Sequence, residues 1–519
     1  MKIKFISLLS LIAALFLTTA CDDFLDETPD RRTELDSDAK IARLLADGYP
    51  TRAFVLPAEW ASDNTDWKQN SNTSLDRVQE QIWAWEDVQE NTGNDSPEDY
   101  WEAAYRAISV ANHALRAIDE AGNPGRLGPH RGEALIIRAY NHFNLVNLFG
   151  LHYSTRSGET DLGVPYAMEP ETTVNPKYER QSVAEVYRLI EKDIIEGLPL
   201  IDDNLYDVPK YHFNKKAALA FATRFYLFYR QYDKVIEYAT QILGEKPSTM
   251  LRDFTEFSVI SSDFQPRAQH YTKMSHNANL LLNSTVSYAY TLGNYSTGKK
   301  YLHSHSISSN ETLQSAGPWG IYSGSLYHLS PSTYGEYVST PKMPYYFEYS
   351  DPIARTGYRH TIITNFTADE ILLCRAEAYI MKQEYNKAVD DLQLWLSNRT
   401  VSPDIRLNRD LINEFYSEIA YYIPEDPTPK KRLNPEVPIV SDEQENFLHC
   451  LLHIRRIETV FEGLRWFDVK RFGIEIHRRY LDINGDVAAV LDELTIDDPR
   501  RAMQIPAAVI SAGLTPNPR

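Results

Sequence analysis

Cysteine is scarce in this sequence, with only Cys21, Cys374 and Cys450 among 519 residues. The three form no CxxC pair, and no Cys/His spacing typical of a metal site occurs. Cys374 and Cys450 fall within helical patterns, which predicts two buried thiols that pack as small apolar side chains. A disulfide between them stays an alternative, because one sequence does not give their distance in space.

Basic residues are outnumbered, since 53 Lys and Arg side chains face 72 Asp and Glu side chains, for a net charge of −19. A nucleic-acid-binding protein needs a basic surface, so this charge argues against one. It also disfavours polyanionic ligands, although a local basic pocket can override the total. The simplest interpretation is an acidic surface that keeps the protein soluble.

Motifs of the common enzyme classes are missing. The sequence contains no GxSxG, HExxH or P-loop, and no GxGxxG between a strand and a helix. Asp63 and Asp66 could form the carboxylate pair of a glycosidase, but any loop with several acids meets that requirement. His303 and His305 have no third ligand nearby in the sequence. No cofactor and no metal site is therefore predicted.

Long apolar runs are missing except at the N-terminus. There, two lysines precede an apolar run from Phe5 to Leu17, and Ala20 leads into Cys21. A basic start with so short a run predicts a signal peptide over residues 1–20, because a membrane span needs about 20 apolar residues. Cys21 resembles the lipid acceptor of bacterial lipoproteins, and the acids after it resemble the stretch that sends Bacteroidetes lipoproteins to the cell surface. The mature chain would then be anchored to the outer membrane by lipid on Cys21.

The chain is organised around one predicted helix at residues 131–150, RGEALIIRAYNHFNLVNLFG. Apolar residues recur at steps of three or four on one face, and a second apolar face lies beside it. An apolar arc this wide predicts a helix packed between neighbours rather than on a surface. Gly150 is expected to end the helix, because glycine accepts the left-handed conformation.

Further helices are predicted on both sides of this segment. Ser96 followed by Pro97 is a helix start, with serine as N-cap and proline at the first helical position. Other patterns predict helices over 38–45, 182–198, 215–229 and 233–243, and a helical hairpin over 368–398. Four residues of that hairpin fit the small and aromatic positions of a tetratricopeptide repeat: Ala376, Tyr379, Tyr385 and Ala388. The hairpins 215–243 and 368–398 are expected to stack, since neither can bury its apolar face alone.

The composition changes over residues 286–349, where tyrosine, serine, glycine and threonine are frequent and charged residues are few. A disordered linker would be poor in aromatic residues. The segment is therefore predicted to form folded loops and turns with short strands.

Two helical segments resemble a known family. RAYNHFNLVNLFG, at 138–150, resembles the "RAY…F.L…YG" helix of SusD/RagB-type surface lipoproteins of Bacteroidetes. LLHIRRIETVFEGLRWFDVKRFG, at 451–473, resembles the family's "ERR.EL.FEG.R..DL.R" helix, with Ile454 where the family has an acid. On this second helix, Glu462 with Arg465 and Asp468 with Arg471 are expected to pair on one face.

The resemblance implies a mostly α-helical fold with tetratricopeptide-like hairpins and a long aromatic-rich loop insertion. Residues 21–519 would form one domain, with an N-terminal helical part at about 35–245, a ligand-side insertion at about 250–365 and a C-terminal helical part at about 366–519. The implied function is non-catalytic: binding of a glycan or other nutrient oligomer and its delivery to a SusC-like TonB-dependent outer-membrane transporter. A peptide-binding RagB-like protein, a surface glycoside hydrolase and a protein-binding tetratricopeptide scaffold stay alternatives.

Sugars present apolar C–H faces and a rim of hydroxyl groups, so a site for them needs flat aromatic rings beside amides and carboxylates. Two stretches supply these groups and are predicted to bind the ligand: Asp63, Asn64, Asp66 and Trp67, and Trp319, Tyr322 and Tyr327. The setting Gly317-Pro318-Trp319-Gly320 favours an exposed turn. The resemblance also implies an aromatic arc drawn from roughly these two regions.

Overall fold

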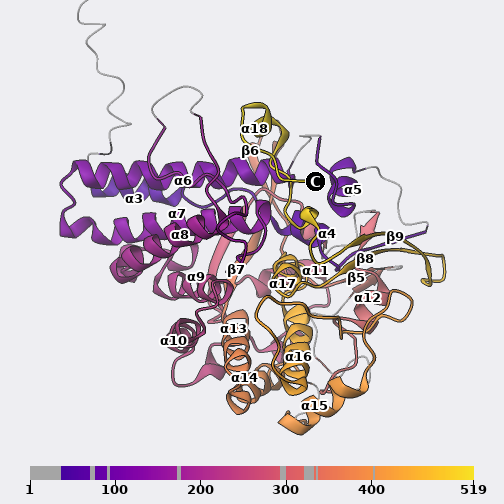
Figure 1. Cartoon of the computed structure of the whole chain (residues 1–519). Helices are drawn as coiled ribbons and strands as arrows, with labels where there is room; N and C mark the ends of the chain where they lie inside the picture. The colour runs from indigo at the N-terminus through magenta and orange to yellow at the C-terminus, as the bar shows by residue number, and fades with distance from the viewer. Residues whose placement is uncertain are drawn as a thin grey trace, which may run out of the picture.

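The structure is a computed structural model, and helices make up most of its regular secondary structure (Figure 1). It describes residues 35, 37–69, 76–89, 94–171, 177–292, 300–320, 326, 332–334, 337–400 and 404–519. The mostly α-helical fold class predicted from the sequence is confirmed. The predicted lipid acceptor Cys21 and the predicted ligand residues Tyr322 and Tyr327 lie outside the described residues.

The N-terminal helices lie side by side in a layer at one end of the molecule (Figure 1). They are α3 (Asp38–Ala46), α6 (Pro97–Glu120), α7 (Gly128–Phe149) and α8 (Val183–Gly197). The predicted helix start is confirmed, since the Ser96 side chain accepts the backbone N–H of Asp99 over 3.0 Å. Helix α7 is buried on nearly its whole circumference, as its wide apolar arc predicts.

Gly150 ends α7, but the expectation of a left-handed glycine there is wrong. Its φ is −114° and its ψ is 174°, which is extended backbone that any residue can adopt. The requirement for glycine comes instead from a close approach: a Cβ would lie 2.8 Å from the carbonyl oxygen of Val146 and 3.2 Å from that of Leu162.

The two predicted hairpins are confirmed and stack in one helical body. The first comprises α9 (Lys215–Phe228) and α10 (Tyr232–Leu243), and the second α13 (Ala368–Met381) and α14 (Tyr385–Ser397). Helix α13 packs against both α9 and α10, as Figure 1 shows. A buried ion pair joins the two hairpins, because the Arg224 guanidinium on α9 binds both carboxylate oxygens of Glu370 on α13.

The C-terminal helices are α15 (Arg409–Glu418), α16 (Asp442–Glu458) and α17 (Arg465–Arg471). The expected single helix over 451–473 is wrong, because the chain turns between α16 and α17, with φ of 67° at Phe461 and 76° at Gly463. A Cβ on Gly463 would also lie 3.1 Å from the Cα of Val55, so the turn favours glycine twice.

This turn separates one of the two ion pairs expected on the helix. Glu462 accepts hydrogen bonds from Lys342 and Tyr271, whereas Arg465 binds Asp63, so the expected Glu462–Arg465 pair is wrong. The Asp468–Arg471 pair is confirmed, with 2.8 Å between Oδ1 and Nη2.

Within the described residues, the strands form three small sheets. A four-stranded sheet has the order β3 (Tyr301–Leu302), β1 (Asp66–Lys68), β8 (Ile476–Leu481) and β9 (Val487–Leu494). Strand β1 runs antiparallel to β3 and parallel to β8, so segments far apart in the sequence meet in this sheet. The other sheets are β2 (Asn279–Thr285), β7 (Thr356–Thr367) and β6 (Tyr346–Asp351), and the hairpin of β4 (Ser332–Tyr334) and β5 (Tyr337–Ser339). Short strands in the aromatic-rich segment are thus confirmed.

Five further short helices complete the described part of the fold. They are α4 (Val55–Ala61), α5 (Arg77–Trp83), α11 (Phe264–Tyr271), α12 (His305–Asn310) and α18 (Ala507–Ser511). One cluster of buried apolar residues extends from Ile41 to Leu514 and unites the helices with the sheets. Cys374 and Cys450 are free thiols within it, as predicted. Across the described ranges, no helix combines the length and the apolar character that crossing a bilayer requires.

Candidate ligand-binding surface

Three aromatic residues on adjacent strands form a row across the four-stranded sheet. Trp67 on β1 is paired in register with Tyr301 on β3 and with Tyr480 on β8. The ring centroid of Trp67 lies 4.7 Å from that of Tyr480 and 6.2 Å from that of Tyr301. Residues opposite each other on neighbouring strands point to the same face, so the sheet itself aligns these rings. We call these three residues the aromatic row.

The row has an accessible side and a buried support. Trp67 and Tyr480 are partly exposed, whereas Tyr301 is buried. Tyr301 stacks on Trp83 of α5, with centroids 4.2 Å apart and planes 13° from parallel. The indole N–H of Trp83 donates to the carbonyl of Thr65, just before β1. Trp83 therefore fixes the rings from below, while Trp67 and Tyr480 are open to a ligand.

A cation and a carboxylate lie beside the exposed rings. Lys300 Nζ lies 4.1 Å from the centroid of the Trp67 ring and 2.9 Å from Oε1 of Glu80. Glu80 is on α5, and the next residue toward the N-terminus, Gln79, donates its side-chain amide to the carbonyl of Tyr301 over 3.2 Å. Flat apolar rings next to charged groups that can donate and accept hydrogen bonds suit a ligand with both C–H and hydroxyl surfaces.

A buried charge network lies on the opposite face of β1. Two hydrogen bonds of 2.9 and 2.7 Å join Arg479 of β8 to Asp66. Asp63 binds Arg465 through both carboxylate oxygens, at 2.8 and 2.9 Å. The network contains three carboxylates and four cationic groups: Asp63, Asp66, Glu311, Lys431, Arg456, Arg465 and Arg479.

The neighbouring cations keep the carboxylates of this network ionised. Burial alone would raise the pKa of Asp63, but Arg456, Arg465 and Lys431 hold it well below its ordinary value. Burial likewise opposes ionisation of Glu311, and Lys431, Arg456 and Arg479 nevertheless lower its pKa to about 2. A catalytic acid needs a proton to give at neutral pH, so neither carboxyl suits that role.

The structure places three of the predicted ligand residues in this interior. Asp63, Asn64 and Asp66 are 7%, 0% and 3% exposed. Asn64 donates to Glu59 over 2.8 Å and accepts from Arg456 over 2.9 Å. Their polar groups are bound within the protein, which differs from the expected open platform. Of the three, Asp66 ties β1 to β8 through Arg479 and so aligns Trp67 with Tyr480.

For the second predicted stretch, around Trp319, one expectation is met and another is not. The turn at Trp319 forms, since Gly317 and Gly320 exchange two backbone hydrogen bonds, but the expectation that it is exposed is wrong. The Trp319 side chain is 1% exposed and packs against Trp395 and His453, with ring centroids 6.1 and 4.9 Å apart. Of the seven predicted ligand residues, Trp67 alone lies both among the described residues and partly open to solvent.

His303 and His305 do not come together as a metal site. His303 is buried, and its two ring nitrogens contact the carbonyl of Asn64 and the hydroxyl of Thr312 at 3.0 and 2.9 Å. His305 is exposed at the start of α12 and lies 3.3 Å from the hydroxyl of Ser309. Both nitrogens of His303 are therefore used within the fold.

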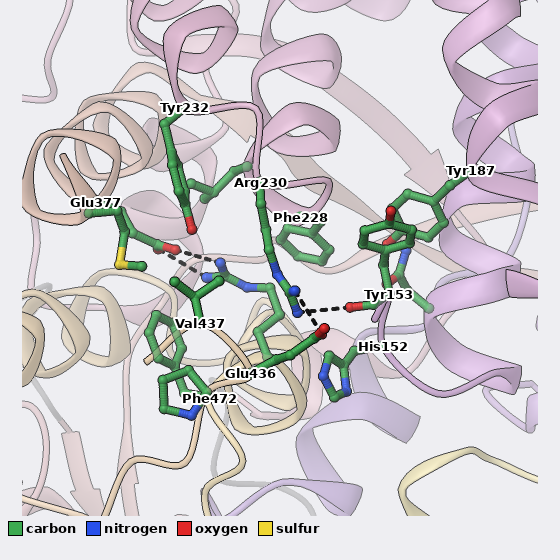
Figure 2. A pocket seen from close by; sticks show the side chains of 15 residues that line it. His152, Tyr153, Tyr187, Phe228, Arg230, Tyr232, Glu377, Glu436, Val437 and Phe472 are labelled. Atoms are coloured by element: carbon green, nitrogen blue, oxygen red, sulfur yellow. Dashed lines mark hydrogen bonds and ion pairs between the residues drawn. The ribbon is translucent and has the colours of Figure 1, made fainter. Parts of the chain in front are cut away.

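Figure 2 shows a small pocket between the helical parts. The Arg230 guanidinium points toward Glu436, with 2.7 Å between Nη1 and Oε2. Arg471 binds both carboxylate oxygens of Glu377 on another side of the pocket. These ion pairs hold the helices together. Because the charges are already paired with each other, the pocket is a weaker candidate for ligand binding than the aromatic row.

Sequence comparison matches two family models to the chain. Residues 23–227 match a SusD-like family described as starch-binding and associating with the outer membrane, and residues 340–503 match the SusD family. Together the two models cover well over half of the chain. The chain belongs to the SusD family. No curated protein matches it in sequence.

Solved structures of the SusD superfamily share the fold along nearly the whole chain. A SusD superfamily protein from Bacteroides thetaiotaomicron is 19% identical, with 92% of this chain and 97% of that chain covered and a TM-score of 0.60. One from Bacteroides fragilis is 16% identical, with 92% and 98% covered and a TM-score of 0.63. A SusD-like carbohydrate binding protein from Bacteroides vulgatus is 14% identical, with 91% and 96% covered and a TM-score of 0.59.

Proposed function

We propose that this SusD-family protein binds a glycan on the aromatic row at the cell surface and delivers it to a SusC-like TonB-dependent outer-membrane transporter. The observation that carries the proposal is the register of Tyr301, Trp67 and Tyr480 on three adjacent strands. Sugar rings bury their C–H faces on flat aromatic surfaces. A partly exposed row of such rings is therefore suited to an extended oligosaccharide.

The surroundings of the row favour binding without a large rearrangement. Trp83 supports Tyr301 from below, and the Asp66–Arg479 ion pair holds β1 against β8. A site whose side chains are already fixed loses less conformational entropy when the ligand arrives. The Lys300 ammonium lies over the Trp67 ring and is paired with Glu80, and both charged groups are placed to exchange hydrogen bonds with sugar hydroxyls.

The cellular location of the protein, at the outer membrane, is part of the proposal. Residues 1–20 would be removed as a signal peptide, and lipid on Cys21 would hold a single domain, residues 21–519, at the outer membrane. The basic start, short apolar run and following cysteine support this, as does the description of the matched family as associating with the outer membrane. The handover to a transporter rests on the family resemblance.

The test is a titration with polysaccharides, oligosaccharides and peptides by affinity gel electrophoresis and calorimetry, followed by variants of the row. Losing an aromatic anchor at the centre of a site costs about 2 kcal/mol, which is roughly a thirtyfold loss of affinity. We expect this loss for Trp67→Ala and Tyr480→Ala. Tyr349→Ala is the matched control, because Tyr349 is 54% exposed on β6, in a different sheet.

Three outcomes would redirect the proposal. Affinities of both row variants within about twofold of the parent, with folding unchanged, would place the site elsewhere. Binding of peptides instead of glycans would favour the RagB-like alternative. New reducing ends after incubation of purified protein with a bound glycan would favour the glycoside hydrolase.

A further inference from the structure

Two histidines and a glutamate gather in a part of the molecule that the aromatic row does not use. Glu256 belongs to the 3-10 helix η6 (Phe254–Val259), His270 lies near the end of α11, and His276 lies in the turn that follows. Oε2 of Glu256 is 3.1 Å from Nε2 of His270 and 4.0 Å from Nδ1 of His276. One ligand atom from each residue lies within 4.8 Å of the other two.

These distances are close to those of a metal site with three protein ligands. Two ligands of a tetrahedral zinc ion, each about 2.1 Å from the metal, lie about 3.4 Å apart. The observed 3.1 and 4.0 Å fall on either side of that spacing, so small rotations of the side chains suffice to close the site. The Glu256 side chain is half exposed, which leaves a further coordination position open to water.

The turn that carries His276 is fixed by buried polar groups. Arg252 donates to the carbonyl of Tyr271 over 2.8 Å and to the side-chain oxygen of Asn279. The Asn279 amide in turn donates to the carbonyls of Tyr271 and Lys273, at 2.9 and 3.0 Å. These bonds hold the turn against the end of α11, so the two imidazole rings stay adjacent, with centroids 4.4 Å apart.

A small apolar cluster separate from the main core supports the same three residues. It consists of Phe254, Phe257 and Tyr271, which join η6 to α11. The edge of the His270 ring packs against Phe257, with centroids 4.9 Å apart and planes at 89°. Packed side chains therefore support the three residues. Their charged neighbours include the cations Arg252 and Lys273.

One buried nitrogen of the cluster makes no hydrogen bond to the described residues. Nε2 of His276 is inaccessible to solvent and has no hydrogen-bond partner among the residues that the structure describes. An unsatisfied buried polar atom in a native fold calls for an explanation, such as an ion or a ring that reorients when one binds. A half-turn of the ring about the Cβ–Cγ bond moves Nε2 to the position of Cε1, next to the place that Nδ1 leaves, and either nitrogen of a histidine can serve as a metal ligand.

We propose that Glu256, His270 and His276 bind a divalent transition-metal ion of the zinc class. Two imidazoles and one carboxylate favour Zn²⁺ over Ca²⁺ and Mg²⁺, which prefer oxygen ligands alone. The ion joins η6 to α11 and to the turn after it, in addition to the small apolar cluster that already packs η6 against α11. The site did not show in the sequence, because the spacing from Glu256 to His270 to His276 matches no metal motif.

The experiment is a calorimetric titration of the full chain, purified without a polyhistidine tag, with ZnCl₂, together with the metal content after gel filtration. We expect one Zn²⁺ per chain and a higher midpoint of thermal unfolding when Zn²⁺ is present. Single variants His270→Ala, His276→Ala and Glu256→Gln should each weaken binding by about tenfold or more. Glu256→Gln keeps the shape of a half-exposed side chain, so its effect does not depend on a folding defect.

The controls are His113→Ala and His305→Ala, which remove exposed histidines outside the cluster and should leave zinc affinity unchanged. CaCl₂ in place of ZnCl₂ should give no binding that the three variants alter. The proposal is overturned if the wild-type chain retains no zinc, or if the triple variant binds zinc as tightly as the parent.

Discussion

The Asp66 carboxylate on β1 and the Arg479 guanidinium on β8 form a two-bonded ion pair in the interior, at 2.9 and 2.7 Å. The next residues along each strand, Trp67 and Tyr480, pack against each other on the opposite face of the same two strands, with their ring planes tilted by 57°. The ion pair therefore fixes the register that aligns the aromatic row. The buried ion pair and the accessible aromatic pair therefore lie on opposite faces of the same pair of strands, β1 and β8.

The first prediction concerns this ion pair. Asp66→Asn should lower the free energy of unfolding by about 3 kcal/mol, because it leaves a buried guanidinium without its main counter-charge. We place the loss at the low end of the range for buried pairs, since Glu311 lies 3.3 Å from Arg479 and remains. Urea denaturation measures the change. Arg126→Gln, which removes an exposed ion pair with Asp38, should cost less than about 1 kcal/mol. Equal effects of the two substitutions would contradict the structural role of Asp66.

A second prediction separates Trp67 from Trp319, both of which were predicted to bind the ligand. Trp319→Ala should lower the free energy of unfolding by about 3–5 kcal/mol, because it empties a buried site against Trp395 and His453. Trp67→Ala, at a partly exposed position, should cost clearly less stability and should instead weaken glycan binding. Thermal or chemical unfolding of both variants, followed by titration of each folded protein, tests the contrast. The reverse order of stability losses would show that Trp67 is the structural residue.

Local patterns predicted most of the helical framework. Ser96 with Pro97 gives a helix start by a hydrogen bond within one turn, and the stacked hairpins follow from apolar faces that cannot be buried alone. The predictions that failed are those that depend on contacts between residues far apart in the sequence. Gly463 turns the chain inside an apparent helix because it packs against Val55, far away in the sequence. No pattern within residues 451–473 contains that contact.

The candidate site depends even more on contacts between distant segments, which a sequence pattern does not show. Trp67 is named by the sequence, but its partners Tyr301 and Tyr480 are not, because they join it only through strands from three distant segments. The sequence of β8, IHRRYL, has no regular alternation of apolar and polar residues that would indicate a strand, and it does not name the neighbouring strand. Asp63 and Asp66 looked like ligand groups because a sequence shows carboxylates without the arginines that neutralise them.

The third prediction is a pH dependence that Glu311 confers. Burial alone would raise its pKa, but Lys431, Arg456 and Arg479 lower it to about 2, against 4.5 ordinarily. A carboxyl whose pKa is lower in the folded state stabilises the fold above the ordinary pKa, and this stability is lost as the pH falls from 4.5 to about 2. The contribution is about 3 kcal/mol. Denaturation at several pH values should therefore give a shallower acid slope for Glu311→Gln than for the parent.

The control for this slope is Glu414→Gln, which changes an exposed glutamate on α15 and should leave the acid slope as it is in the parent. The comparison uses slopes, because Glu311→Gln also removes buried ion pairs and lowers stability at every pH. Parallel curves for Glu311→Gln and the parent would refute the lowered pKa.

The last prediction is lipidation at Cys21, and it tests the proposed address of the protein. Cys21→Ala should move the protein from the outer-membrane fraction to soluble fractions, because lipid on Cys21 is the membrane attachment that we propose. Binding to a transporter could keep some of the variant at the membrane without any lipid. An alkaline carbonate wash distinguishes the two cases, because it strips proteins held by other proteins and leaves lipid-anchored chains in place. Cys374→Ala is the matched control, since its thiol is buried and should leave the membrane association unchanged. A Cys21→Ala chain that resists the wash as the parent does would exclude the lipid anchor, while the glycan-binding proposal would remain open to its own test.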